Sequence, residues 1–163
     1  MKVIRIMKKY ILFLISAALL CSCSDRVDVV FDTPFVSISD EAELNSTMMV
    51  DKEANNLLTS LTVRLCVSNH FFTEPITVKY EMEADGLTEG VDFKVQPNTK
   101  SPLTFDPGNY TAPIRIIWMK NPDFDPDKKN TLTITLTWAS IPEMVLGYPG
   151  PDALRSTFTF TKK

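Results

Sequence analysis

The 163-residue sequence has 17 basic and 20 acidic side chains, a formal net charge of −3, and three cysteines. Proteins that bind nucleic acid cluster Lys and Arg to neutralise phosphates, and this composition has no such excess. The length suits one domain with a buried core. Composition and charge therefore predict one acidic domain and exclude nucleic acid as a partner.

Residues 1–22 have the layout of a secretory signal peptide. Four basic residues precede the first acid, Asp25, and Tyr10–Leu20 is a largely apolar run of 11 residues. A membrane-spanning helix needs about 20 apolar residues, so this run predicts a signal segment and not a span. Translation starts at Met1 or at Met7, which two lysines follow directly.

The end of this run resembles a bacterial lipobox, which has Leu three places before the acylated cysteine and a small residue directly before it. Cys23 fits because Leu20 and Ser22 precede it, whereas Cys21 follows a bulky leucine. The resemblance implies cleavage after residue 22, lipidation of Cys23 and anchoring in an outer membrane. Ser24-Asp25 is similar to the export tag of Bacteroidota-type surface lipoproteins, which favours the cell surface over the periplasmic side. An ordinary signal peptide or a plain buried helix is the alternative.

Cleavage at this point makes the chain more acidic. It removes four basic residues and no acids, and leaves 141 residues with a net charge of −7. Cys66 is then the only thiol besides the acylated Cys23, so no intrachain disulfide can form. The mature chain must therefore rely on its hydrophobic core for stability.

Short strands dominate after about residue 27, because apolar and polar residues alternate with the period of a strand. In chain order the expected strands are Val27–Phe31, Phe35–Ser39, Thr47–Val50, Leu61–Val67, Ile76–Met82, Val91–Val95, Leu103–Phe105, Ile114–Trp118, Leu132–Trp138 and Thr157–Thr161. Turns that contain Gly or Pro separate them. Seven or more such strands predict an all-β fold, an antiparallel β-sandwich. Residues 23–33 are expected to form the lipidated N-terminus, a tether and the first strand, and residues 34–163 a single β-sandwich domain.

The phase of each strand also predicts the core. Six large side chains on the apolar phase are expected between the two sheets: Tyr80, Phe93, Phe105, Ile116, Leu136 and Phe158. Trp118 and Trp138 fall on the apolar phase of their strands, so core packing is the expected role of both rings.

The segment between Ile76 and Trp138 contains an ordered set of motifs. Gly86-Leu-Thr-Glu-Gly-Val-Asp-Phe93 is followed by Leu103-Thr-Phe-Asp-Pro-Gly108 and by Ile114-Arg-Ile116. This order resembles the Calx-beta module, with signature positions at Thr88, Gly90, Asp92, Phe93, Leu103, Thr104, Phe105, Pro107 and Gly108. The resemblance implies an immunoglobulin-like sandwich of a kind that is calcium-binding in some proteins and purely adhesive in many.

The whole chain is also similar to small Calx-beta-like lipoproteins encoded beside glycan-uptake systems. This similarity implies a surface protein that binds a glycan or another polymer. The alternative is a structural or adhesive role, as a spacer or as a subunit that contacts another surface protein.

Residues suited to catalysis are scarce. His70 is the only histidine and reads as a loop residue, so a site with several imidazole ligands is excluded. No Ser or Cys stands beside a recognisable base, and Cys66 lies on the polar phase of its strand. Glycoside hydrolysis needs two carboxylates about 5–9.5 Å apart across a cleft, which a small sandwich seldom provides. We therefore expect no enzyme activity and no cofactor.

Three aspartates at alternate positions, Asp123, Asp125 and Asp127, are weak calcium candidates. An EF-hand loop would continue with Gly at its sixth place and Glu at its twelfth, but Lys128 and Ile134 stand there. Lysines at 128 and 129 would also repel a cation, so the expected outcome is a solvated loop without metal.

Tyr148 is the sharpest candidate for ligand contact. Gly and Pro surround it in the segment Leu146–Asp152, which predicts a rigid turn that presents an aromatic ring. Trp138 would add a second platform if the chain folds back on it, and Asp152 would accept hydrogen bonds from sugar hydroxyls. A tyrosine that caps the end of the core is the alternative.

Overall fold

The computed structural model describes residues 33–67 and 72–163, which lie in the compact unit Phe31–Lys163. The signal segment, Cys23, the expected strand Val27–Phe31 and His70 lie outside the described residues. In the part of the chain that is described, no helix is long and apolar enough to cross a bilayer.

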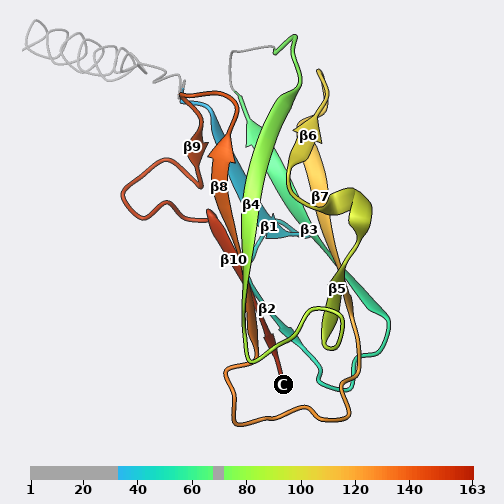
Figure 1. Cartoon of the computed structure of the whole chain (residues 1–163). Helices are drawn as coiled ribbons and strands as arrows, with labels where there is room; N and C mark the ends of the chain where they lie inside the picture. Colours follow the sequence, from blue (N-terminus) through green and yellow to red (C-terminus); the bar gives the residue numbers. More distant parts are fainter. Residues whose placement is uncertain (1–32, 68–71) are drawn as a thin grey trace, which may run out of the picture. The chain divides into compact units, whose positions relative to one another are not determined.

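The described residues form ten strands in two sheets (Figure 1). The strands are β1 (Phe35–Asp40), β2 (Thr47–Val50), β3 (Leu57–Cys66), β4 (Ile76–Asp85), β5 (Phe93–Val95), β6 (Leu103–Phe105), β7 (Thr111–Trp118), β8 (Thr131–Ala139), β9 (Val145–Leu146) and β10 (Thr157–Lys162), with one short 3₁₀ helix, η1 (Pro97–Thr99). The first sheet has the order β5-β7-β3-β1-β9 and the second β2-β10-β8-β4-β6. The prediction of an all-β sandwich with seven or more strands is confirmed.

The two sheets are mixed. Neighbouring strands are antiparallel along most of each sheet, although no two neighbours are consecutive strands of the described chain. At one edge of each sheet the pairing is parallel: β9 lies beside β1, and β2 lies beside β10. Each parallel pair joins segments far apart in the sequence, so no turn signal announces it.

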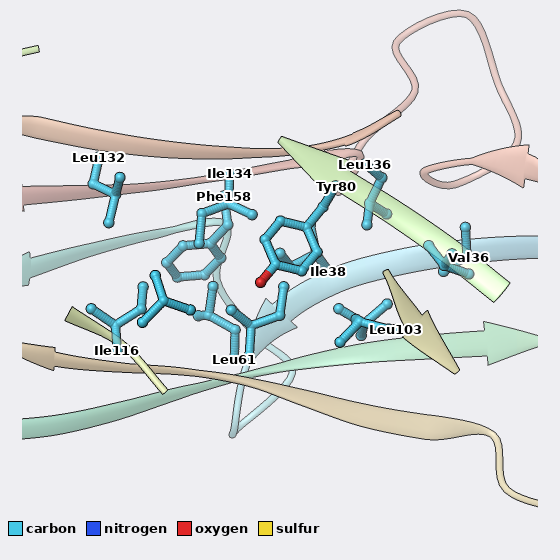
Figure 2. Close-up of a cluster of buried hydrophobic side chains, with 14 of the residues drawn as sticks. Val36, Ile38, Leu61, Tyr80, Leu103, Ile116, Leu132, Ile134, Leu136 and Phe158 are labelled. Carbon is cyan, nitrogen blue, oxygen red and sulfur yellow. The ribbon is translucent and has the colours of Figure 1, made fainter. Parts of the chain in front are cut away.

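The core lies between the sheets. All six side chains predicted to be buried are at most 6% exposed. Figure 2 shows the rings of Tyr80 and Phe158 between strands of both layers. The Tyr80 hydroxyl donates to the Thr99 carbonyl at 2.7 Å, and burial raises the pKa of Tyr80 to about 12. Trp118 is fully buried as expected, and its indole N–H donates to the Thr59 hydroxyl at 2.9 Å.

Candidate functional site

The β9–β10 loop, residues 147–156, carries Tyr148 on a closed backbone. The Tyr148 N–H donates to the Leu154 carbonyl at 2.6 Å, so the loop closes on itself. The Ile38 N–H donates to the Arg155 carbonyl at 2.9 Å, which fastens the end of the loop to β1. Two anchored ends leave the segment around Tyr148 little freedom to lose when a ligand binds.

Gly147 explains the shape of this loop. Its φ is +86°, a region that L side chains rarely adopt. A Cβ at this position would lie 2.4 Å from the carbonyl oxygen of Ala153, on the opposite side of the loop. The Gly147 N–H also donates to the Val36 carbonyl at 2.8 Å. Only glycine allows the two sides of the loop to approach this closely while the chain stays bound to β1.

The Tyr148 ring is partly packed and partly exposed. It meets the Phe35 ring edge-on, with centroids 5.4 Å apart and planes at 80°. The Arg155 guanidinium lies over the ring, 4.9 Å from its centroid. The side chain is nevertheless 36% exposed. The ring thus covers the start of β1 and still presents an edge to solvent.

Trp138 is 45% exposed, so the expectation of core packing for this ring was wrong. The reason is a β-bulge between β8 and β4. Tyr80 pairs with Leu136, but Lys79, the residue before it in β4, pairs with Trp138. The extra residue in β8 reverses the strand phase, and the ring turns to the outer face. There the Lys79 ammonium lies 4.9 Å from the ring centroid.

The structure brings these candidates to one end of the sandwich without stacking them. Strands β8 and β9 are in contact, so the end of β8 with Trp138 lies near the start of the loop with Tyr148 (Figure 1). The Trp138 ring packs against Lys79, and the Tyr148 ring packs against Phe35 and Arg155. Exposed Asp152 belongs to the same loop as Tyr148. The arrangement offers two separate aromatic surfaces, each beside a cation that can donate hydrogen bonds.

The three aspartates of the calcium hypothesis lie exposed in the β7–β8 loop. The Asp127 N–H donates to Asp125 Oδ1 at 3.0 Å, and Lys128 Nζ lies 3.9 Å from Asp125 Oδ2. Asp125 is therefore already engaged within its own loop. Within residues 33–67 and 72–163, no cluster of three or more His, Cys, Asp or Glu is arranged to hold a metal ion.

We expect millimolar calcium to leave the melting temperature unchanged. A real site would raise it by mass action, since the ion would bind the folded state alone. Thermal unfolding with and without calcium checks this, with magnesium as the control. A rise specific to calcium that disappears in Asp125→Ala would contradict the prediction.

A buried ion pair near this loop was not anticipated from the sequence. Lys162, at the end of β10, is 1% exposed, and Asp92 is 2% exposed. Lys162 Nζ lies 3.3 Å from Asp92 Oδ1 and donates to the Met119 carbonyl at 2.7 Å. The Asn121 amide and the Thr88 N–H donate to the same carboxylate, at 3.0 and 2.9 Å. These contacts satisfy both charges inside the protein.

Solved structures share this architecture, although no known protein family and no curated protein matches the sequence. CBD12 from CALX1.2 aligns with a TM-score of 0.50 and 19% identity, over 77% of this chain and 44% of that one. EndoBT-3987 of Bacteroides thetaiotamicron, solved with a Man5GlcNAc product, aligns with a TM-score of 0.51 and 10% identity, over 77% and 30%. The chain thus spans less than half the length of either protein. The fold is a Calx-beta-like β-sandwich.

In this Calx-beta-like sandwich the Thr88–Phe93 segment is a turn built around Asp92. The N–H groups of Val91 and Asp92 donate to the Thr88 carbonyl, and the Gly90 N–H donates to the Phe93 carbonyl at 2.8 Å. Gly90 has a φ of +90°, which allows the tight reversal. The motif therefore has a structural role: it places the Asp92 carboxylate against Lys162 and the Phe93 ring in the core.

Cys66, at the end of β3, is the free thiol of the described part of the sandwich. Burial raises the pKa of this thiol, and the nearby Arg64 lowers it by less. A thiol with a raised pKa is a poor nucleophile at neutral pH, which agrees with the absence of a recognisable activating base in its sequence context.

Proposed function

We propose that this chain is a non-catalytic, lipid-anchored surface protein that binds a glycan or another polymer beside an outer-membrane uptake system. The observation that carries the proposal is the pair of half-exposed rings, Trp138 and Tyr148, at one end of the sandwich. Sugars present apolar C–H faces to aromatic rings and hydroxyls to nearby charged groups. Lys79 and Arg155 lie beside these rings, and Asp152 belongs to the same loop as Tyr148.

The stiffness of the β9–β10 loop supports this proposal. Because the loop is already closed, little free energy is lost in ordering it when a ligand binds. A small contact area is therefore enough for weak binding. Weak sites suit a protein that passes a polymer onward. The fold neighbour EndoBT-3987 was solved with Man5GlcNAc, which makes this glycan a reasonable member of a test panel.

Replacing Tyr148 with alanine should weaken retention on a cognate polysaccharide about tenfold, which corresponds to about 1.4 kcal/mol of binding free energy. Because the ring is partly exposed, the melting temperature should change little. Affinity electrophoresis through gels that contain each polysaccharide checks the retention, and Tyr148→Phe, which keeps the ring, is the matched control. Unaltered retention would move the site elsewhere, and a large loss of stability would make Tyr148 a cap of the core.

The anchor is tested separately. Cys23→Ala should release the protein from membranes, whereas Cys21→Ala should not, because only Cys23 has a small residue directly before it. Membrane fractionation and metabolic labelling with palmitate measure the anchoring. Label that persists in the Cys23 variant would contradict the assignment.

A structural or adhesive role is the second candidate, and one observation favours it. Leu44 is 75% exposed and Leu154 is 62% exposed. The two loops that carry them are joined, since Arg155 donates to the Leu44 carbonyl at 3.4 Å. Exposed leucines on linked loops can contact another surface protein. Failure to retain any polysaccharide, together with association that Leu44→Ser and Leu154→Ser abolish, would favour this role.

A further inference from the structure

A pocket of about 290 Å³ opens at the other end of the sandwich from Tyr148. The ends of β2 and β10 and the β7–β8 loop meet there, near the point marked C in Figure 1. Five lysines line the pocket, namely Lys52, Lys128, Lys129, Lys162 and Lys163. Phe124 and Pro126 add an apolar wall, and no acidic side chain is among the lining residues of this described region.

Three of these lysines have carboxylate partners. Lys128 lies 3.9 Å from Asp125, Lys129 lies 2.8 Å from Asp85, and Lys162 forms the buried pair with Asp92.

The other two, Lys52 and Lys163, form no ion pair with an acidic side chain of the described residues. The five lysines thus outnumber their three carboxylate partners and the α-carboxylate of Lys163, the last residue of the printed sequence, on a protein whose overall charge is negative. Such a pocket attracts an anionic group.

Main-chain hydrogen bonds fix the backbone that carries these lysines. The Lys52 N–H donates to the main-chain oxygen of Lys163 at 2.6 Å, and the Lys163 N–H donates to the Val50 carbonyl at 2.9 Å. The Lys162 N–H donates to the Asn130 carbonyl at 2.9 Å, which ties β10 to the β7–β8 loop. The three segments are therefore joined before any ligand arrives, and the backbone of the pocket is preorganised.

We propose that this pocket binds an acidic sugar residue, such as a uronic acid or a sulfated sugar, of the captured glycan. The inference rests on the proposed function, because it names the chemical class of that ligand. The carboxylate or sulfate pairs with Lys52 and Lys163, and the sugar ring covers Phe124 and Pro126. Small-molecule pockets measure about 300–1,000 Å³. At about 290 Å³ this pocket lies at the lower limit, which matches a ligand as small as one sugar ring. A bare inorganic anion would leave the apolar wall uncovered, which is why the ring belongs to the assignment.

The pocket is distinct from the aromatic end. Strand β8 runs from Thr131, next to the pocket, to Ala139, next to Trp138. At about 3.3 Å per residue, this strand separates the two places by roughly 25–30 Å. The effect of a substitution in the pocket on binding can therefore be measured separately from the effect of one at the aromatic end.

The test is calorimetric titration of the full chain in detergent with three acidic tetrasaccharides: galacturonate, chondroitin sulfate and heparin fragments. We expect at least one to bind, and the affinity to fall at least tenfold in the double variant Lys52→Gln/Lys163→Gln. The control variant is Lys94→Gln, an exposed lysine of β5. Binding should also weaken as salt increases, because the contact is ionic and open to solvent.

Each outcome supports or overturns the inference. Binding by none of the three tetrasaccharides, or equal affinity of the double variant, would overturn it. So would equally tight binding of methyl-esterified galacturonate, inorganic phosphate or glycerol phosphate, since these lack the charge or the ring.

The two proposals fail separately. One outcome is that Tyr148→Ala weakens retention of the protein on neutral glycans while no acidic tetrasaccharide binds. This outcome would support the proposed function and overturn the acidic pocket. An acidic tetrasaccharide that binds through Lys52 and Lys163 but is indifferent to Tyr148 would support the pocket and remove Tyr148 from the capture site.

Discussion

Replacing Asp92 with alanine should lower the free energy of unfolding by about 3–5 kcal/mol, because it leaves the Lys162 ammonium buried without a counter-charge. The carboxylate also accepts from Thr88 and Asn121, so the substitution removes several contacts at once. Urea denaturation followed by tryptophan fluorescence measures the loss. A value below about 1 kcal/mol would show that the ammonium finds water in the folded state.

Two comparisons make this test sharper. Glu81→Ala removes an exposed acid from β4 and should change stability by no more than about 0.5 kcal/mol. The double variant Asp92→Leu/Lys162→Met replaces both charges with apolar side chains, and should recover most of the stability lost in Asp92→Ala. No recovery would mean that the hydrogen bonds to Asp92, and not the missing counter-charge, dominate its contribution.

Phe105→Ala should also cost about 3–5 kcal/mol, since it removes a large ring from a closely packed core. Phe105 is 2% exposed and ends β6, an edge strand of three residues with no other large ring. The same denaturation experiment applies, and a circular dichroism spectrum of β type should persist.

Leu58→Ala is the matched control for this substitution. Leu58 is 53% exposed on β3, so its truncation should cost well under 1 kcal/mol. Similar losses for the two variants, or a helical spectrum of the parent protein, would contradict the sandwich core described here.

Strand periodicity predicted most of this fold from local information. Thr47–Val50 and Leu103–Phe105 were predicted with the bounds that the structure shows, and Phe35–Ser39 is one residue shorter than β1. Alternation succeeds because one face of each strand packs on the core. It could not predict the parallel partners of β1 and β10, since these depend on segments distant in the sequence.

The candidate site was less predictable. Regular alternation along the strand assigns Trp138 to the core. That assignment was wrong because a β-bulge, which no local sequence pattern indicates, reverses the phase of β8. Lys162 was not expected to be buried, because charged side chains are almost never fully buried unless they are paired. Its phase was nevertheless informative: Phe158, Phe160 and Lys162 alternate with threonines and all three are buried. A signal for the buried pair was therefore present, and charge alone argued against it.

The position of β10 between β2 and β8 has a consequence for biosynthesis. The ribosome releases β2 and Asp92 long before β10. During this time β2 has no strand partner at β10, and Asp92 has no ion pair with Lys162. Pairing between segments so distant is slow to form and leaves the nascent chain open. The second sheet therefore cannot close until β10 has left the ribosome. Under the proposed surface location this delay is an advantage, because secretion channels thread polypeptides that have not yet folded.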